Sequence, residues 1–205
     1  DSEIKNISPS ERPAYGVYFG ATSDSSNTIM NCKIYDFTSY GIYLSAATGT
    51  IIDSCEIYMN TASTSSTVYG IYYTNTSATI PTYLVKNRIY GLGGSPTGAV
   101  KGIYTMGISN VSTNVRIENN TIKLEPVTTG TVDGIDYYGY AANSMYIYYN
   151  TIYIGGATTG GDSYGIRKRD ATTNFTVINN SIQNSRTNTS GTASHYAIYI
   201  SDIDF

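Results

Sequence analysis

The chain has 205 residues, with 12 Lys or Arg against 15 Asp or Glu, so its net charge is -3 at pH 7. This balance excludes the electrostatic attraction on which nucleic-acid binding depends, and no run of about 18 or more apolar residues predicts a membrane span. The length suits one domain with a core or a short array of repeats.

A four-residue string, most often Tyr-Gly-Ile-Tyr, recurs along the whole chain. In chain order its copies occupy residues 15–18, 40–43, 69–72, 101–104, 133–136, 164–167 and 196–199. The second residue is Gly in every copy except the last, where it is Ala197. Successive copies lie 25 to 32 residues apart.

A second string alternates with the first and ends in Ile at each copy. It occupies residues 31–34, 54–57, 86–89, 119–122, 149–152 and 179–182. Two markers that keep one order and nearly one period indicate a repeat protein, in which each repeat is one structural unit. A unit this short cannot bury an apolar face alone and must stack on its neighbours.

The segments around both strings are rich in Ile, Val, Tyr and Thr and alternate apolar with polar residues, which predicts β-strands. Gly, Ser, Thr and Asn clusters such as 62–67 and 155–161 predict the connecting turns and arms. We therefore expect an all-β fold, a right-handed parallel β-helix of about six to seven coils with roughly 30 residues per coil. It forms a single domain over 1–205, with a polar segment at 1–13. A propeller needs longer four-stranded repeats, and a leucine-rich repeat needs regularly spaced Leu.

One polar position recurs two residues before each Ile of the second string. Its occupants are Cys32, Cys55, Asn87, Asn120, Asn150 and Asn180. Stacked Asn side chains form an amide ladder between coils, so we interpret this row as structural rather than as a binding site. We expect two packed thiols in preference to a disulfide between Cys32 and Cys55, and no metal site.

An outward row of aromatic residues follows from the first string, because its Ile points inward. The candidate binding or contact face consists of Tyr18, Tyr43, Tyr72, Tyr104 and Tyr199. Three interpretations remain open for this face: rings that stack on one another between coils, a platform for sugar rings, and a contact surface for another protein.

Charged residues gather where the tyrosine row is interrupted, at Lys101, Asp133, Asp136 and Arg167. Lys101 and Asp133 share one repeat position, as do Asp136 and Arg167, so pairing between neighbouring coils is expected. A polar binding patch is the alternative. The single histidine, His195, precedes the last strand and is expected to be a hydrogen-bonded surface residue.

The passages 179–187 and 195–199, with the recurring Tyr-Gly-Ile-Tyr, resemble large secreted bacterial right-handed parallel β-helix repeat proteins, especially surface proteins with C-terminal secretion-sorting domains. The resemblance spans nearly the whole chain and implies the fold and an extracellular or cell-surface location. It implies no particular activity. The chain starts at Asp1 and shows no sorting domain, so we expect a fragment or a subunit of a larger array.

Pectate lyases and polygalacturonases share this fold, but the polygalacturonase motifs Asn-Thr-Asp, Asp-Asp, Gly-His-Gly and Arg-Ile-Lys do not occur in the sequence. We therefore expect a non-catalytic extracellular structural protein without a cofactor. Its coils would form a rigid rod that stacks end to end with another copy or with further coils of the same chain. The alternative is a carbohydrate-binding or polysaccharide-lyase-like β-helix.

Overall fold

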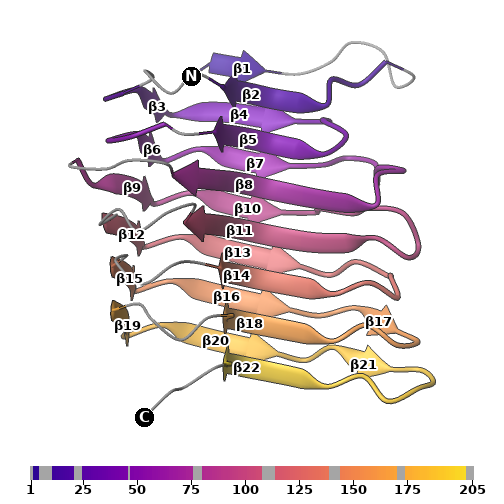
Figure 1. Ribbon diagram of the computed structural model, residues 1–205. Coiled ribbons are helices and arrows are strands. Elements are labelled where there is room, and N and C mark those ends of the chain that lie inside the picture. Colours follow the sequence, from indigo (N-terminus) through magenta and orange to yellow (C-terminus); the bar gives the residue numbers. More distant parts are fainter. Residues whose placement is uncertain are drawn as a thin grey trace.

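The chain folds into a parallel β-solenoid, as the sequence predicts. The computed structural model describes residues 2–4, 11–20, 25–45, 47–75, 80–107, 114–138, 144–169 and 174–201. Within these ranges the chain passes repeatedly through three stacked sheets and forms no helix. Figure 1 shows the coils one above another, with the first and last strands at opposite ends of the stack.

Each face of the solenoid is one parallel sheet with one strand per coil. Sheet 1 contains β1 (Ser2–Ile4), β4 (Cys32–Tyr35), β7 (Glu56–Tyr58), β10 (Arg88–Tyr90), β13 (Thr121–Leu124), β16 (Thr151–Ile154) and β20 (Ser181–Asn184). Sheet 2 contains β2 (Tyr15–Phe19), β5 (Tyr40–Ser45), β8 (Thr67–Asn75), β11 (Ala99–Gly107), β14 (Val132–Tyr138), β18 (Ser163–Lys168) and β22 (His195–Ile200). Sheet 3 contains β3 (Thr28–Met30), β6 (Ile51–Asp53), β9 (Thr82–Val85), β12 (Asn114–Glu118), β15 (Ser144–Tyr148) and β19 (Asn174–Ile178).

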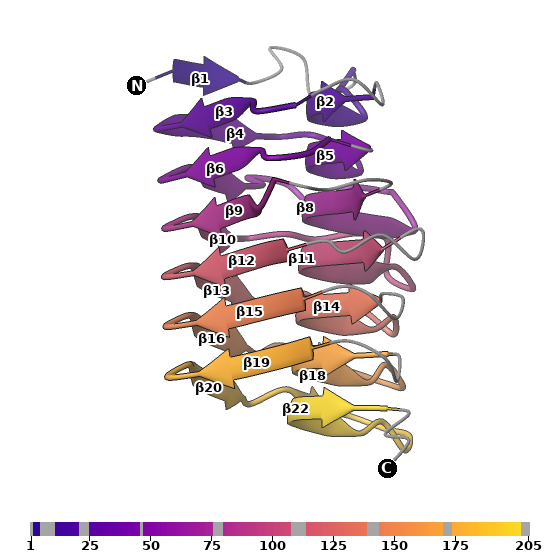
Figure 2. The same ribbon diagram turned by 60° about the vertical axis from the view of Figure 1, so that its left-hand side comes forward.

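The connections between the sheets differ in length. Long arms lead from sheet 1 to sheet 2, and two of them form the short parallel pair β17 (Ala157–Thr158) and β21 (Thr187–Asn188). Figure 2 shows that the corners from sheet 3 to sheet 1 are tight by comparison. The arms are therefore the part of each coil that can vary without disturbing the stack.

A left-handed residue makes each tight corner. It has φ between 54° and 58° and is Asn31, Ser54, Lys86, Asn119, Tyr149 or Asn179. This conformation is costly for residues other than Gly. In five of the six corners a hydrogen bond to the next coil offsets the cost. The Lys86 backbone N, for example, donates to the carbonyl O of Glu118 at 2.9 Å, and the corners at Asn31, Ser54, Asn119 and Tyr149 follow the same pattern.

Neighbouring coils pair so that each residue lies on the equivalent residue of the next coil. The core is therefore built from columns of aliphatic side chains. In sheet 1, Ile34 lies on Ile57, Ile57 on Ile89 and Ile89 on Ile122. All four are fully buried. Burial of a side chain of this size stabilises the fold by about 1.5–3 kcal/mol, and each repeat adds another.

Glycine permits a local break in the alternation of sheet 2. A Cβ atom on Gly41 would lie 2.5 Å from the carbonyl O of Gly70 and 2.5 Å from Cγ2 of Ile57. Because the strand bends there, Tyr40 and Tyr43 lie on the same outer face although they are three residues apart, with ring centroids 4.9 Å apart.

The polar segment 1–13 contains a strand that the sequence did not predict. Residues 2–4 form β1, which pairs with β4 so that Ile4 lies on Ile34. Residues 1 and 5–10 lie outside the described ranges. Among the described residues, nothing forms a helix able to cross a membrane.

Candidate functional site

The outer face of sheet 2 holds two adjacent columns of tyrosines, not one. The first column, which sequence analysis missed because strict alternation places it inward, contains Tyr15, Tyr40 and Tyr69, with centroids 5.0 Å apart. The expected column contains Tyr18, Tyr43, Tyr72 and Tyr104, with neighbouring centroids 4.8 to 5.3 Å apart. We call these seven residues the tyrosine face.

Rings of the tyrosine face cover one another. Within each column most rings are stacked, and between the columns they meet edge to face, as Tyr69 and Tyr72 do at 4.9 Å. Exposure falls along the face from 56% at Tyr18 to 8% at Tyr104. Desolvation raises the pKa of both Tyr69 and Tyr72. The face therefore presents ring edges, whereas a sugar platform needs open ring faces. The fifth expected tyrosine, Tyr199, lies apart from this face on β22, beside Tyr164 and Tyr196.

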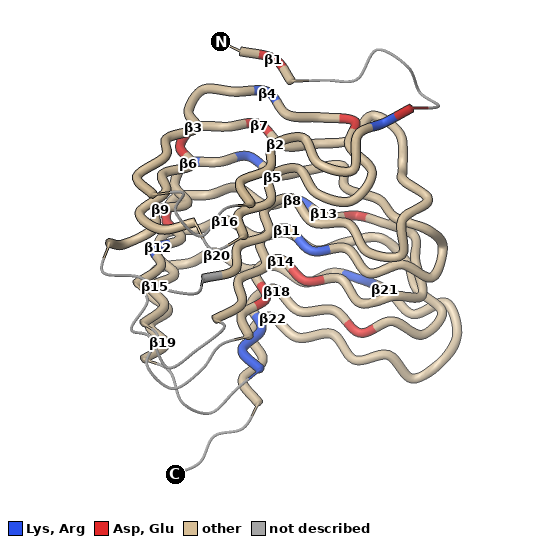
Figure 3. The backbone as a smooth tube through the Cα atoms, turned by 45° about the horizontal axis from the view of Figure 1, so that its top comes forward, with Lys and Arg blue, Asp and Glu red and all other residues tan. Residues whose placement is uncertain are grey.

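The charged residues that interrupt the columns do come together. Lys101 Nζ lies 3.0 Å from Asp133 Oδ2 and also pairs with Asp136. Arg167 Nη1 lies 3.7 Å from Asp133 Oδ1. Figure 3 shows charged segments of both signs near β14, β18 and β22. The group forms one network across three coils.

The network differs in one pairing from the expected arrangement. Asp136 and Arg167 are in register, but Asp136 accepts two hydrogen bonds of 2.9 Å from Arg169, while Arg167 reaches back to Asp133. Arg169 follows the end of β18, and its backbone N donates to the carbonyl O of Tyr137 at 3.0 Å. That hydrogen bond places its side chain over Asp136, which register alone could not reveal.

Asp133 is the least satisfied member of this charged network. It is 0% exposed, and its ionic contacts with Lys101 and Arg167 fall outside hydrogen-bonding geometry. Desolvation, opposed by Lys101 and reinforced by Asp136, raises the pKa of Asp133 to about 6. A buried carboxyl of this kind holds a proton more readily than one in water.

The four asparagines of the polar row form a continuous ladder. Asn120 Nδ2 donates to Asn150 Oδ1 at 3.0 Å and to the carbonyl O of Leu84 at 2.8 Å. Its Oδ1 accepts from the backbone N and Nδ2 of Asn87. Asn180 continues the ladder beyond Asn150 in the same way. The side-chain amide of each of these four asparagines is therefore hydrogen-bonded within the fold, next to the tight corners.

Both cysteines are free thiols. Cys55 Sγ donates weakly to the carbonyl O of Ile29 at 3.7 Å, one coil above the place where Asn87 Nδ2 donates to Ile52 at 2.9 Å. The thiol therefore substitutes for the amide. Desolvation raises the pKa of Cys55 to about 11, so it remains protonated at neutral pH.

His195 is half-buried at the start of β22 and belongs to a hydrogen-bond network. Its Nδ1 lies 2.8 Å from Ser163 Oγ, and its Nε2 lies 2.8 Å from Asn188 Oδ1. A hydroxyl, an imidazole and an amide in this order resemble a nucleophilic triad. Ser163 is nevertheless 0% exposed and also contacts Asn184, so its hydroxyl is not accessible to a substrate.

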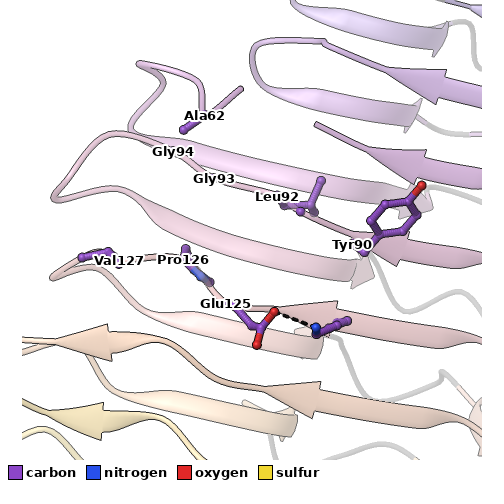
Figure 4. A pocket seen from close by; sticks show the side chains of 10 residues that line it. Ala62, Tyr90, Leu92, Gly93, Gly94, Glu125, Pro126 and Val127 are labelled. Carbon is purple, nitrogen blue, oxygen red and sulfur yellow. Dashed lines mark ion pairs between the residues drawn. The ribbon is translucent and has the colours of Figure 1, made fainter. Parts of the chain in front are cut away.

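A groove on the arms was not indicated by the sequence. Its larger hollow, of about 450 Å³, lies between successive arms and is lined by residues that include Ala62, Tyr90, Gly93, Lys123, Glu125 and Val127 (Figure 4). A second hollow, of about 260 Å³, shares Val127 and is lined mainly by threonines. We call the two hollows together the arm groove.

Within the described ranges, no group of three His, Cys, Asp or Glu side chains is placed to hold a metal ion. Comparisons of the chain with protein-family profiles, with curated proteins and with solved structures give no match in any of the three.

Proposed function

We propose that this chain is a non-catalytic structural protein of the cell exterior, a rigid β-solenoid rod that makes contacts at its ends. The observation that supports this most directly is the use of its recurring polar and aromatic groups within the stack. Asn120 and its equivalents bond to the next coil, the tyrosine rings stack on the next ring, and Asp136 is bound by Lys101 and Arg169.

An enzyme needs reactive groups that a substrate can reach. The groups that could suggest catalysis here are Asp133, Asp136 and Ser163, and all three are buried. Sugar binding at the tyrosine face loses support for a related reason, because the ring faces are covered by neighbouring rings.

The two ends of the stack expose apolar residues that are buried elsewhere in the columns. Ile198 on β22 is exposed, whereas its register partner Ile166 is fully buried. At the other end Tyr18 is exposed, whereas Tyr104 of the same column is buried. Open strand edges recruit further strands. Further coils of the same chain, or a second copy that places its β2 on β22, would continue sheet 2 and both tyrosine columns.

Ala197 limits how tightly such an end contact can form. A Cβ atom on Gly165 would lie 2.5 Å from the carbonyl O of Ala197 in the following coil. By the same geometry, the methyl group of Ala197 would meet the carbonyl O of Gly16 of a stacked copy. We therefore expect weak, concentration-dependent association of the unmodified protein.

Light scattering across a wide concentration range, with negative-stain microscopy, tests the proposal. The wild-type chain should form end-to-end rods at high concentration, Ala197→Gly should do so at about tenfold lower concentration, and Ile198→Asp should remain monomeric. Wild type and Ala197→Gly that both stay monomeric would overturn the end contacts. Release of unsaturated sugar from pectin would overturn the non-catalytic assignment.

A further inference from the structure

We propose that the arm groove binds a neutral oligosaccharide. This inference is independent of the rod proposal, because the groove lies on the side of the stack and not at its ends. Three features carry it: an open hollow formed by glycines, a tyrosine at the end of an aromatic column, and an exposed ion pair beside them.

The hollow exists because the first part of the arm after β10, residues 91–94, has almost no side chains on its outer surface. Gly91, Gly93 and Gly94 line it, while the Leu92 side chain packs in the core. Ala62 of the preceding arm bounds one side and Pro126 of the following arm bounds the other, as Figure 4 shows. Bare backbone at the base of a hollow leaves amide and carbonyl groups within reach of a ligand.

Tyr90 ends a third tyrosine column, on sheet 1. Tyr35, Tyr58 and Tyr90 stack with centroids 4.8 and 5.0 Å apart. The next residue in register is Lys123, so the column stops at the groove. Tyr90 thus has Tyr58 stacked on it, and the guanidinium carbon of Arg88 lies 4.6 Å from its ring centroid. The part of the ring that lines the hollow is left to contact an apolar face of a sugar ring.

Lys123 and Glu125 supply polar groups at the same place. Lys123 Nζ lies 2.9 Å from Glu125 Oε2, with the two side chains 56% and 46% exposed. An exposed pair of this kind is worth little to stability, so its atoms can turn to sugar hydroxyls at small cost. The ammonium donates and the carboxylate accepts.

Charge selects the class of sugar. The lining of the larger hollow contains one cation and one anion, already paired, and the lining of the second hollow contains no charged residue. Arg88, which lies over the Tyr90 ring, is paired with Glu56 at 3.5 Å. A uronate or sulfated glycan would therefore meet Glu125 without an unpaired cation to offset it. The groove therefore suits neutral sugars.

The combined length of the two hollows indicates a ligand of more than one sugar unit. Val127, 79% exposed, borders both hollows. Beyond it the second hollow offers hydroxyl and methyl groups of threonines such as Thr129, Thr159 and Thr189. An apolar residue between two partly polar hollows fits successive rings of a short chain.

Titration calorimetry with cellohexaose, xylohexaose and mannohexaose, against oligogalacturonate as the charged comparison, tests this proposal. At least one neutral hexasaccharide should bind, and Tyr90→Ala and Glu125→Gln should each weaken it by about tenfold. Tyr43→Ala, on the tyrosine face, is the matched control and should bind as the wild type does. Unchanged circular dichroism would show that each variant is folded.

Two results would overturn the site. One is that none of the three neutral hexasaccharides binds, and the other is that Tyr43→Ala loses binding while Tyr90→Ala keeps it. Tighter binding of oligogalacturonate than of every neutral sugar would contradict the charge argument. None of these results bears on end-to-end association, which Ala197→Gly and Ile198→Asp measure separately.

Discussion

At the scale of single residues, position 55 is where a thiol takes a place that amides hold in the next four coils. The backbone N of Cys55 donates to Asn87 Oδ1 at 3.0 Å, so the ladder reaches this coil from below. Cys55 offers Cys32 no hydrogen bond of similar strength, because a thiol is a weak donor and a weak acceptor.

Cys55→Asn should extend the ladder by one coil. The new Nδ2 would donate to the carbonyl O of Ile29 and the new Oδ1 would accept from Cys32, which should stabilise the fold by about 1–2 kcal/mol. Urea unfolding followed by circular dichroism measures the change, with Cys55→Ala as the control. An Asn variant no more stable than the Ala variant would contradict the ladder argument.

Asp133 should give the protein a measurable pH dependence. Burial raises its pKa from 3.8 to about 6, so between these values the folded state holds a proton that the unfolded state has released. Stability from this group is therefore complete below about pH 4 and is lost as the pH rises through 6. Unfolding measured from pH 4 to 7 should show that decline, and Asp133→Asn should flatten it. An identical slope in both proteins would mean that Asp133 is not the cause.

The residue rows show how far a sequence can predict a site. The asparagine ladder was predictable because one side chain recurs at one register position, and register follows from the repeat. The contact between Arg169 and Asp136 was not predictable, because Arg169 follows the end of β18 and strand register does not place it. The arm groove was not predictable either, since it depends on how three arms lie against one another and on side chains that glycine lacks.

At the scale of elements, the strands of sheet 2 depend sterically on the glycine at one repeat position. A Cβ atom on Gly134 would lie 2.5 Å from the carbonyl O of Gly165 and 2.6 Å from Cγ2 of Ile152. Both neighbours belong to paired strands, so neither can move without disturbing its coil.

Gly134→Ala should therefore destabilise the fold by about 1–3 kcal/mol, the usual cost of overpacking. Gly160→Ala is the matched control, because nothing lies within 4 Å of its added Cβ. Thermal unfolding should show a lower midpoint for the first variant and an unchanged one for the second. Equal midpoints would show that the column of glycines is not sterically required.

Strand prediction from the sequence succeeded wherever a repeat marker was present, and it failed at β1. The marker strings contain Ile at a fixed place and are framed by turns, whereas Ser2–Ile4 has only three residues in a polar context. Its pairing with β4 comes from the open edge of the stack and not from its own composition. Tertiary context can impose a strand where local propensity is weak.

At the scale of the whole molecule, the order of strands in each sheet follows the order of coils. In sheet 2, for example, β11 pairs with β8 on one side and with β14 on the other. Stability in such an array is close to a sum over neighbouring coils. Loss of one interior contact should therefore weaken two adjacent coils before it affects the others.

This arrangement sets how the solenoid responds to tension. The hydrogen bonds between coils run along the long axis, and each coil is held by the one before and the one after it. A pull on the two ends would detach the coils one at a time. Each coil of about 30 residues would release up to about 100 Å of chain, so extension under force should proceed in steps of about that length.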